Sequence, residues 1–337
     1  MKKLGKILLG MAITLAVLLV VAISLTIGWR PFVGPRARPL TSRQFERTAQ
    51  RLERGRYLFA ASTGCTGCHS LHDWNTHGGP ILAGGEGVGQ VMWFNNLPGR
   101  IVASNITPDP ETGAANWTDD QLARAIREGI GHDGRALFPM MPYENLRHMS
   151  DEDLASLVVY IRSLPAVRQE LPATEIIFPV KYLIRAVPQP VTEPVSSPDR
   201  TDPVKWGHYL VTISSCGECH TPRIRGALVP GLEYGGGLRL EGPWGGAAAA
   251  NITPDATGIG YYDEALFVQA MRTGFVKAKK LNSIMPFGEF KDLTDEDLKA
   301  MFAYLRTLKP VKHRVDNSLP PTYCKRCRQN HGAGDQN

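Results

Sequence analysis

Two copies of the pentapeptide C-x-x-C-H, at residues 65–69 and 216–220, indicate the chemistry that this chain performs. In each copy two cysteine thiols stand two residues apart, and a histidine follows the second thiol directly. This spacing is the attachment signal for c-type haem, in which the sulfurs form thioether bonds to the porphyrin and the histidine ligates the iron. The sequence therefore predicts two covalently bound haem c groups. The residues expected to hold them are Cys65, Cys68 and His69 in the first copy and Cys216, Cys219 and His220 in the second.

Short motifs surround both haem signals and occur in the same order in each half of the chain. They are G-x-Y-L at 55–58 and 207–210, N-I-T-P-D at 105–109 and 251–255, M-P at 141–142 and 285–286, and (S/T)-D-E-D-L at 150–154 and 294–298. A repeat at this distance is too long for a solenoid and indicates duplication of a whole domain. We therefore expect two tandem domains with one haem in each.

Each iron needs a sixth ligand, and Met141 and Met285 are the candidates because they stand at matching positions in both halves. Histidine and methionine together give the high-potential arrangement that is used for electron transfer. Met140 competes with Met141, whereas Met285 has no neighbouring rival. The histidines without a counterpart in the second half are interpreted as loop or surface residues: His72, His77, His132 and His148.

The elements that position these residues are predicted to be mainly helical. Ser150 and Thr294 are N-cap candidates, and the acidic residues after each favour a helix N-terminus. Apolar residues then recur at helical spacing. Thr118 resembles the first residue of a capping box. The glycine-rich stretches 78–89 and 235–246 lack the phosphate-loop pattern, and we expect them to fold over the haem.

Composition and charge agree with an exported two-domain protein. The chain has 337 residues, and glycine (34) and proline (25) exceed their usual share, which indicates loop-rich domains. The formal net charge is +6, of which Lys2, Lys3 and Lys6 supply half. The rest is nearly balanced, unlike a nucleic-acid-binding protein. All six cysteines stand in C-x-x-C pairs, so none remain for a dispersed disulfide framework.

An uncharged apolar run at residues 7–27 follows the three lysines. A spanning helix needs about 20 apolar residues, whereas a cleavable signal has an apolar core of about 7–15. An uncleaved signal-anchor is therefore favoured, with the lysines in the cytoplasm and Trp29 at the outer interface. Cleavage near residues 22–24 is the alternative, and both interpretations export the rest of the chain.

The tail carries a third cysteine pair, Cys324 and Cys327, but Arg328 stands where a haem signal has histidine. Arginine cannot ligate iron, so no third haem is expected. A local disulfide is the expected state of this pair in an oxidising compartment. A metal site that uses His331 is the alternative, although it is short of ligands.

Taken together, the repeated motifs resemble those of the multihaem cytochrome c subunits of bacterial membrane-associated dehydrogenases, including alcohol and gluconate dehydrogenases. The resemblance covers roughly residues 45–312. It implies a mainly α fold, with two tandem cytochrome c-type domains after an N-terminal transmembrane helix, and the haem residues named above. Better-known members carry three C-x-x-C-H domains and a C-terminal membrane-binding segment. This chain departs from that pattern, so the family's particular partner does not transfer to it.

The expected organisation has five parts. They are a signal-anchor helix (1–30), cytochrome c domain 1 (41–165), a proline-rich linker (166–203), cytochrome c domain 2 (204–312) and a C-terminal tail (313–337). Apolar residues within the linker predict that part of it packs against the domains.

Two functions from different classes follow from these observations. The first is a relay, without catalysis of its own, that passes electrons from an exported dehydrogenase to a membrane oxidase or cytochrome complex of the respiratory chain. It would be anchored in the bacterial inner membrane with its haem domains in the periplasm. The second is a dihaem enzyme such as a peroxidase, which needs one iron with an open sixth position. Matching methionines in both halves favour the relay.

Overall fold

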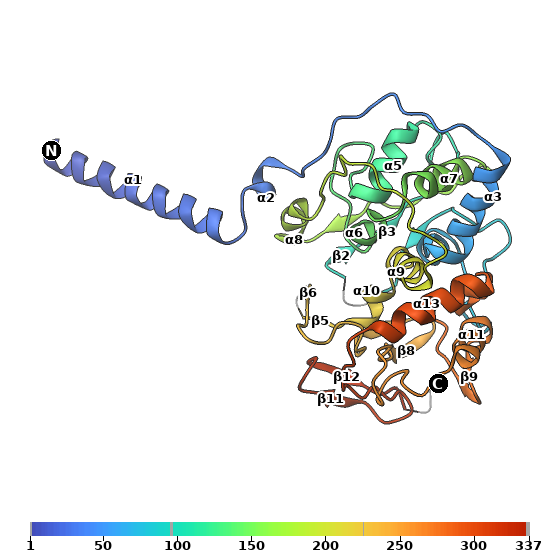
Figure 1. Ribbon diagram of the computed structural model, residues 1–337. Helices are drawn as coiled ribbons and strands as arrows, with labels where there is room; N and C mark the ends of the chain where they lie inside the picture. Colours follow the sequence, from blue (N-terminus) through green and yellow to red (C-terminus); the bar gives the residue numbers. More distant parts are fainter. Residues whose placement is uncertain (1, 95–96, 225, 335–337) are drawn as a thin grey trace.

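The computed structural model describes residues 2–94, 97–224 and 226–334, which form one projecting helix and a globular body (Figure 1). The projecting helix is α1 (Lys2–Leu25), and the body is mainly helical, as the sequence predicts. Its helices are α2 (Arg30–Val33), α3 (Ala49–Tyr57), η1 (Leu58–Ser62), α4 (Cys65–His69), α5 (Asp119–Glu128), α6 (Tyr143–Leu146), α7 (Asp151–Ile161), α8 (Val180–Leu183), η2 (Ile184–Ala186), α9 (Pro203–Ile213), α10 (Cys216–His220), α11 (Glu264–Thr273), α12 (Phe287–Phe290) and α13 (Asp295–Thr307).

The strands of the described residues are short and pair two by two, always antiparallel. The pairs are β1 (Gln90–Val91) with β3 (Val102–Ala103), β2 (Gly99–Arg100) with β4 (Glu175–Ile176), β5 (Arg223–Ile224) with β6 (Ala227–Leu228), β7 (Arg239–Gly242) with β8 (Gly245–Ala248), β9 (Phe275–Val276) with β10 (Lys279–Lys280), and β11 (Thr322–Cys324) with β12 (Gln329–His331).

Helix α1 stands away from the body, and its apolar side chains are exposed (Figure 1). One helix within the described residues is long and apolar enough to cross a membrane, and it is α1, over Lys3–Leu25. This length and composition suit both interpretations of the N-terminus, an anchor and a signal sequence.

The helix starts predicted from the sequence are confirmed. The Ser150 hydroxyl caps α7 and the Thr294 hydroxyl caps α13, and each accepts a hydrogen bond from the backbone N–H three residues later. Thr118 and Gln121 form a complete capping box at the start of α5. Each cap satisfies backbone N–H groups that the first helical turn leaves unpaired, and it therefore fixes where the helix begins.

Each half of the body is built on two helices in close contact. Helix α3 packs against α7 in the first half, and α9 packs against α13 in the second. Gly55 and Gly207 permit this contact, because a Cβ atom at either position would collide with a carbonyl oxygen of the facing helix. The glycine of the repeated G-x-Y-L motif is therefore required by packing.

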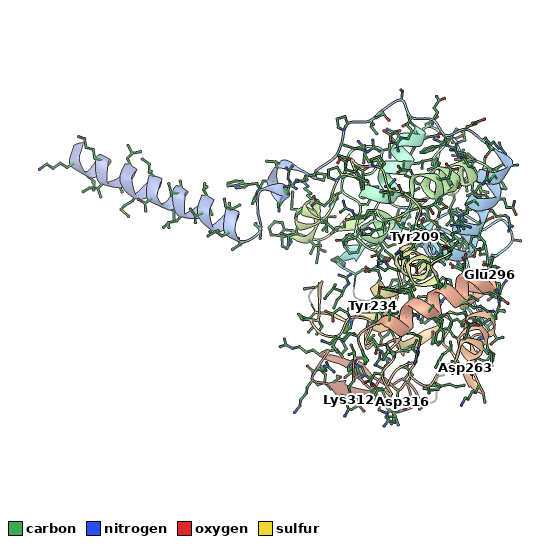
Figure 2. The ribbon with its side chains drawn as sticks, viewed as in Figure 1. Tyr209, Tyr234, Asp263, Glu296, Lys312 and Asp316 are labelled. Carbon is green, nitrogen blue, oxygen red and sulfur yellow. The ribbon has the colours of Figure 1, made fainter. Side chains whose placement is uncertain are left out.

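The tyrosine of the same motif crosses between the halves. Tyr57 at the end of α3 donates a hydrogen bond to Asp297 of α13 at 2.5 Å, and Tyr209 of α9 donates one to Asp153 of α7 at 2.6 Å. Each hydroxyl also accepts a hydrogen bond from the backbone N–H of the N-cap residue of that helix. Tyr209 lies in the middle of the body, between the halves (Figure 2). The start of each long helix is thus tied to the opposite half.

One apolar core continues through both halves. It includes Leu157 of α7, Leu210 of α9 and Leu298 of α13, all of them buried. Part of the predicted linker also packs, as expected, because β4 pairs with β2 and α8 contacts α2. The body therefore holds its two halves in one arrangement.

Replacing Tyr209 with Phe should lower the free energy of unfolding by about 1–3 kcal/mol, because the buried Asp153 carboxylate loses a hydrogen bond that water cannot replace. Arg54 still pairs with Asp153 in this variant. Denaturant unfolding followed by circular dichroism measures the change, with the exposed Tyr261→Phe as control. Equal unfolding free energies for Tyr209→Phe and the wild type would contradict this role.

Candidate functional site

The two C-x-x-C-H pentapeptides form matching single-turn helices, α4 and α10. Each follows a residue in the left-handed region, Gly64 with φ +65° and Ser215 with φ +57°. This turn separates each short helix from the longer helical segment before it. The four cysteines of α4 and α10 are free thiols and half-buried. Both halves therefore present two thiols and one imidazole in the same local geometry.

Both histidines of the pentapeptides are held by their Nδ1 atoms. His69 donates to the Ser104 carbonyl oxygen at 2.7 Å, and His220 donates to the Ala250 carbonyl oxygen at 2.7 Å. Because burial lowers the pKa of both imidazoles, the neutral form is favoured. With the proton on Nδ1, the lone pair is on Nε2, the nitrogen that is free to ligate a metal.

The repeated N-I-T-P-D motifs position these two carbonyl groups. Ser104 and Ala250 stand directly before Asn105 and Asn251. In both motifs the asparagine oxygen accepts hydrogen bonds from the N–H and the hydroxyl of the threonine two residues later. The asparagine N–H₂ donates to a backbone carbonyl beyond the last helix of its half. The motifs are visible in the sequence, but the roles of Ser104 and Ala250 are not, because a backbone carbonyl leaves no signal in side-chain identity.

The candidate sixth ligands also lie in matching surroundings. Met141 and Met285 each precede a proline that is the N-cap of a short helix, α6 or α12. Both side chains are half-buried and pack against the apolar core. Met140, the competing residue, is half-buried but is not among the side chains that pack against that core. The packing favours Met141 in the first half.

The donor set of each half is chemically suited to haem c. It comprises two thiols for thioether bonds, an imidazole with a free Nε2 lone pair, and a methionine thioether. The hydrogen bond at Nδ1 is the outer interaction that commonly orients a metal-binding imidazole. We take these two sets of residues as the candidate site.

The methionine helix of each half contacts the pentapeptide helix of the other. Asn145 of α6 donates to Glu218 of α10 at 3.1 Å. In the reverse direction, Glu289 of α12 approaches Gly67 of α4, and its Oε1 lies 3.4 Å from where a Cβ atom of that glycine would be. The two contacts involve matching positions of the two halves. In the first contact the carboxylate is Glu218 of the pentapeptide helix α10, and in the second it is Glu289 of α12, the helix that follows Met285. The two candidate sites therefore face each other across the middle of the body.

The ionisation of the thiols reflects this closeness. Burial raises the pKa of Cys68 to about 12, and Glu289, Cys65 and Cys219 add to the shift. Cys219 belongs to the opposite half, so its influence on Cys68 requires the two pentapeptides to be near neighbours.

Glu289 is a functional candidate that no motif in the sequence indicates. Its Oε2 is buried without a hydrogen-bond partner among the described residues. Burial raises the pKa of Glu289 to about 7. A carboxyl group that titrates near neutrality therefore lies beside the first pentapeptide.

Residues 52–165 match the family model of cytochrome c. The chain is 34% identical over 278 residues to the cytochrome subunit of fructose dehydrogenase from Gluconobacter japonicus, covering 77% of this chain and 53% of that protein. It is 32% identical over 299 residues to one of the subunits of nicotinate dehydrogenase from Pseudomonas putida, covering 83% of this chain and 23% of that protein.

A third relative, a dihaem c-type cytochrome from Cereibacter sphaeroides, is 27% identical over 276 residues, which is 77% of this chain and 86% of that protein. The chain thus spans only about half of the fructose dehydrogenase cytochrome and less of the nicotinate dehydrogenase protein. The residues matched by the family model include the first pentapeptide, and two of these three relatives are cytochromes by name. Residues 52–165 thus match cytochrome c, and the chain is similar to the cytochrome c subunits of bacterial dehydrogenases.

Proposed function

We propose that this chain is a membrane-anchored dihaem cytochrome that relays electrons from an exported dehydrogenase to the respiratory chain. The observation that carries the proposal is the duplicated donor set: His69 and His220 make the same 2.7 Å hydrogen bond, and each half supplies a methionine in the same position. A duplicated site inside one body suits passage of electrons through the chain.

The residues of the chain divide the work of holding two haems. The two cysteines of each pentapeptide would form the covalent attachment, and His69 and His220 would ligate the iron. Met141 and Met285 would supply the remaining ligand, which would give each iron a full set of protein ligands. When bound, each haem c supplies a one-electron ferric–ferrous couple, and histidine–methionine ligation keeps its potential high. Full ligation leaves no place for a substrate such as peroxide, which favours a relay over an enzyme.

The packing between the halves supports this role. Tyr57 and Tyr209 tie each long helix to the opposite half, and α6 and α12 contact the opposite pentapeptide helices. These contacts hold the two donor sets at a fixed separation. A relay needs a fixed separation because electrons can then pass between the two haems without any movement of the protein.

The partners and the location are part of the same proposal. Relatives include cytochrome subunits of fructose, alcohol and gluconate dehydrogenases, which supports an exported dehydrogenase as the donor. A membrane oxidase or cytochrome complex is the proposed acceptor. The exposed apolar helix α1, with lysines at its start, suits an anchor in the bacterial inner membrane that keeps the body in the periplasm.

Replacing Met141 or Met285 with Leu should remove a sulfur ligand while nearly conserving volume. We expect a folded protein in which one haem drops in potential by on the order of 100 mV, within the roughly 0.8 V range that axial ligands set. That haem should also gain the ability to bind carbon monoxide. Redox titration followed by absorbance separates the two haems.

Met149→Leu is the matched control, because Met149 is buried but has no methionine counterpart in the second half. It should keep both potentials. Two unchanged potentials in Met141→Leu would remove Met141 from the site, and Met140→Leu would then be tested. Carbon monoxide binding by the unmodified protein would favour the peroxidase class instead.

Glu289 should couple the potential of the first haem to pH. Its pKa is raised to about 7, so the carboxyl group is neutral below that pH and negatively charged above it. A negative charge next to the haem favours ferric iron, so the potential should fall as pH rises through about 7. The slope should not exceed about 59 mV per pH unit, the limit for one proton per electron. Redox titrations at several pH values measure it.

Glu289→Gln should flatten this dependence, whereas Glu296→Gln, at an exposed position of α13, should leave it in place. A first-haem potential with the same pH slope in Glu289→Gln and the wild type would assign the coupled proton to another group.

A further inference from the structure

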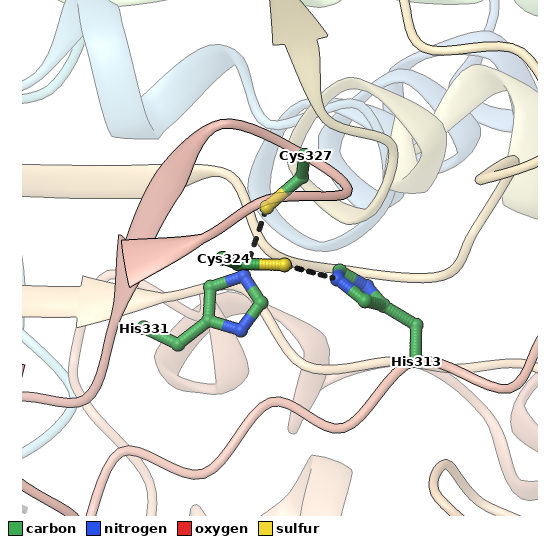
Figure 3. A group of neighbouring side chains, drawn as sticks. All are labelled: His313, Cys324, Cys327 and His331. Carbon is green, nitrogen blue, oxygen red and sulfur yellow. Dashed lines mark hydrogen bonds between the residues drawn. The ribbon is translucent and has the colours of Figure 1, made fainter. Parts of the chain in front are cut away.

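Four metal-binding side chains converge in the C-terminal tail. They are His313, Cys324, Cys327 and His331, and their ligand atoms all lie within 4.8 Å of one another. Figure 3 shows the two close pairs: His313 Nε2 is 3.4 Å from Cys324 Sγ, and His331 Nε2 is 3.0 Å from Cys327 Sγ. The disulfide expected from the sequence is wrong in this structure, because both cysteines are free. His313 supplies the fourth ligand that the alternative interpretation lacked.

The tail is folded so that these side chains meet. Cys324 ends β11 and His331 ends β12, while Cys327 lies in the turn that joins the two strands. Hydrogen bonds tie this hairpin and the segment before it to the second half: the Arg239 N–H donates to the Gln329 side chain at 2.6 Å, and other bonds join Asn317 to Ala248. The tail is therefore an integral part of the second half.

Both imidazoles are set in the protonation form that a metal requires. His313 Nδ1 donates to the Gly235 carbonyl oxygen at 2.8 Å, and His331 Nδ1 donates to the Arg314 carbonyl oxygen at 3.1 Å. Their Nε2 lone pairs are consequently directed at the thiols. His313 is 5% exposed, His331 is 9% exposed and Cys327 is fully buried. Such burial keeps water away from both imidazoles and from the Cys327 thiol.

The backbone comes close to these residues at Gly237. Gly237 has φ +101°, and a Cβ atom at this position would lie 2.8 Å from both His313 Cε1 and His331 Nε2. A side chain here would thus displace the imidazoles. Glycine is required both by the backbone conformation and by the closeness of the cluster.

We propose that His313, Cys324, Cys327 and His331 bind one structural zinc ion. Two thiolates and two imidazoles in a closed set of four protein ligands are the donors that zinc prefers in structural sites, and the C-x-x-C-x-x-x-H spacing has the short intervals typical of them. Magnesium and calcium prefer oxygen ligands, and iron–sulfur clusters usually require four cysteines. A tetrahedron with zinc–sulfur bonds of about 2.3 Å has edges of about 3.8 Å, so small side-chain movements close the set.

The zinc site has a mechanical link to the second haem site. The loop that contains Gly235 and Gly237 separates the two, and between these residues the Gly236 N–H donates to the His220 carbonyl oxygen at 2.7 Å. In the first half, the position that matches Gly237 is Gln90, whose side chain donates to the carbonyl groups of Cys68 and Ser70. In the second half Gly237 has no side chain to do this, and the proposed zinc ion would instead hold the loop through His313, which donates to the Gly235 carbonyl oxygen. This positioning role rests on the proposed dihaem function, whereas zinc binding does not.

The test uses the full-length haem-loaded protein, purified without chelators and analysed for metals, with the chain concentration taken from amino-acid analysis. We expect one zinc per chain in addition to the haem iron, and two thiols that become titratable only after a chelator has removed the zinc. His313→Gln and Cys324→Ser should lose the zinc, and the exposed His148→Gln should keep it. Absence of zinc, copper in its place, or a mass showing a Cys324–Cys327 disulfide would overturn the assignment.

The positioning role has its own readout. Removal of zinc from the intact protein by a chelator should shift the potential of the second haem measurably and leave the first unchanged, so the first haem is an internal control. If zinc is bound but its removal moves neither potential, the positioning role is overturned and the zinc site stands. If zinc is bound but the chain carries no haem, the proposed function fails instead.

Discussion

The hydrogen bond from a histidine Nδ1 atom to a backbone carbonyl is the constraint on which this structure depends. It places the free lone pair of His69 and of His220 on Nε2, while Nδ1 lies 2.7 Å from carbonyl groups that the N-I-T-P-D motifs hold in place. The motif is bound in turn to the chain beyond the last helix of each half. Without this bond the imidazole could rotate. Its Nε2 atom would then no longer have a fixed position relative to the two thiols and the methionine of the same donor set.

The duplication explains how one body holds two such sites. The repeated G-x-Y-L motif has an internal role, in the close helix contact at Gly55, and a role across the boundary, in the bond from Tyr57 to Asp297. The boundary contacts are reciprocal, so the same sequence serves both directions. The halves differ at two pairs of matching positions, Asn145 with Glu289 and Gln90 with Gly237. The first difference places a buried carboxyl group beside the first site, and the second makes room for the tail cluster beside the second site.

The local elements of the fold were predictable from the sequence, and the long-range pairings were not. Ser150 and Thr294 identify helix starts because capping depends on residues three positions apart. The bond from Tyr57 to Asp297 joins residues 240 positions apart, and no pattern in the sequence specifies it. His313 was overlooked as a ligand for the same reason, since it lies outside the C-x-x-C-x-x-x-H spacing. Glu289 became significant only through its burial, which depends on the whole body.

The number and location of covalent haems test the central claim most directly. Mass spectrometry of the denatured protein, followed by peptide mapping, would measure both. The account predicts two haems per chain, one on the peptide that contains Cys65 and Cys68 and one on the peptide that contains Cys216 and Cys219, with none on the tail. A single haem, or a third haem on Cys324 and Cys327, would contradict it.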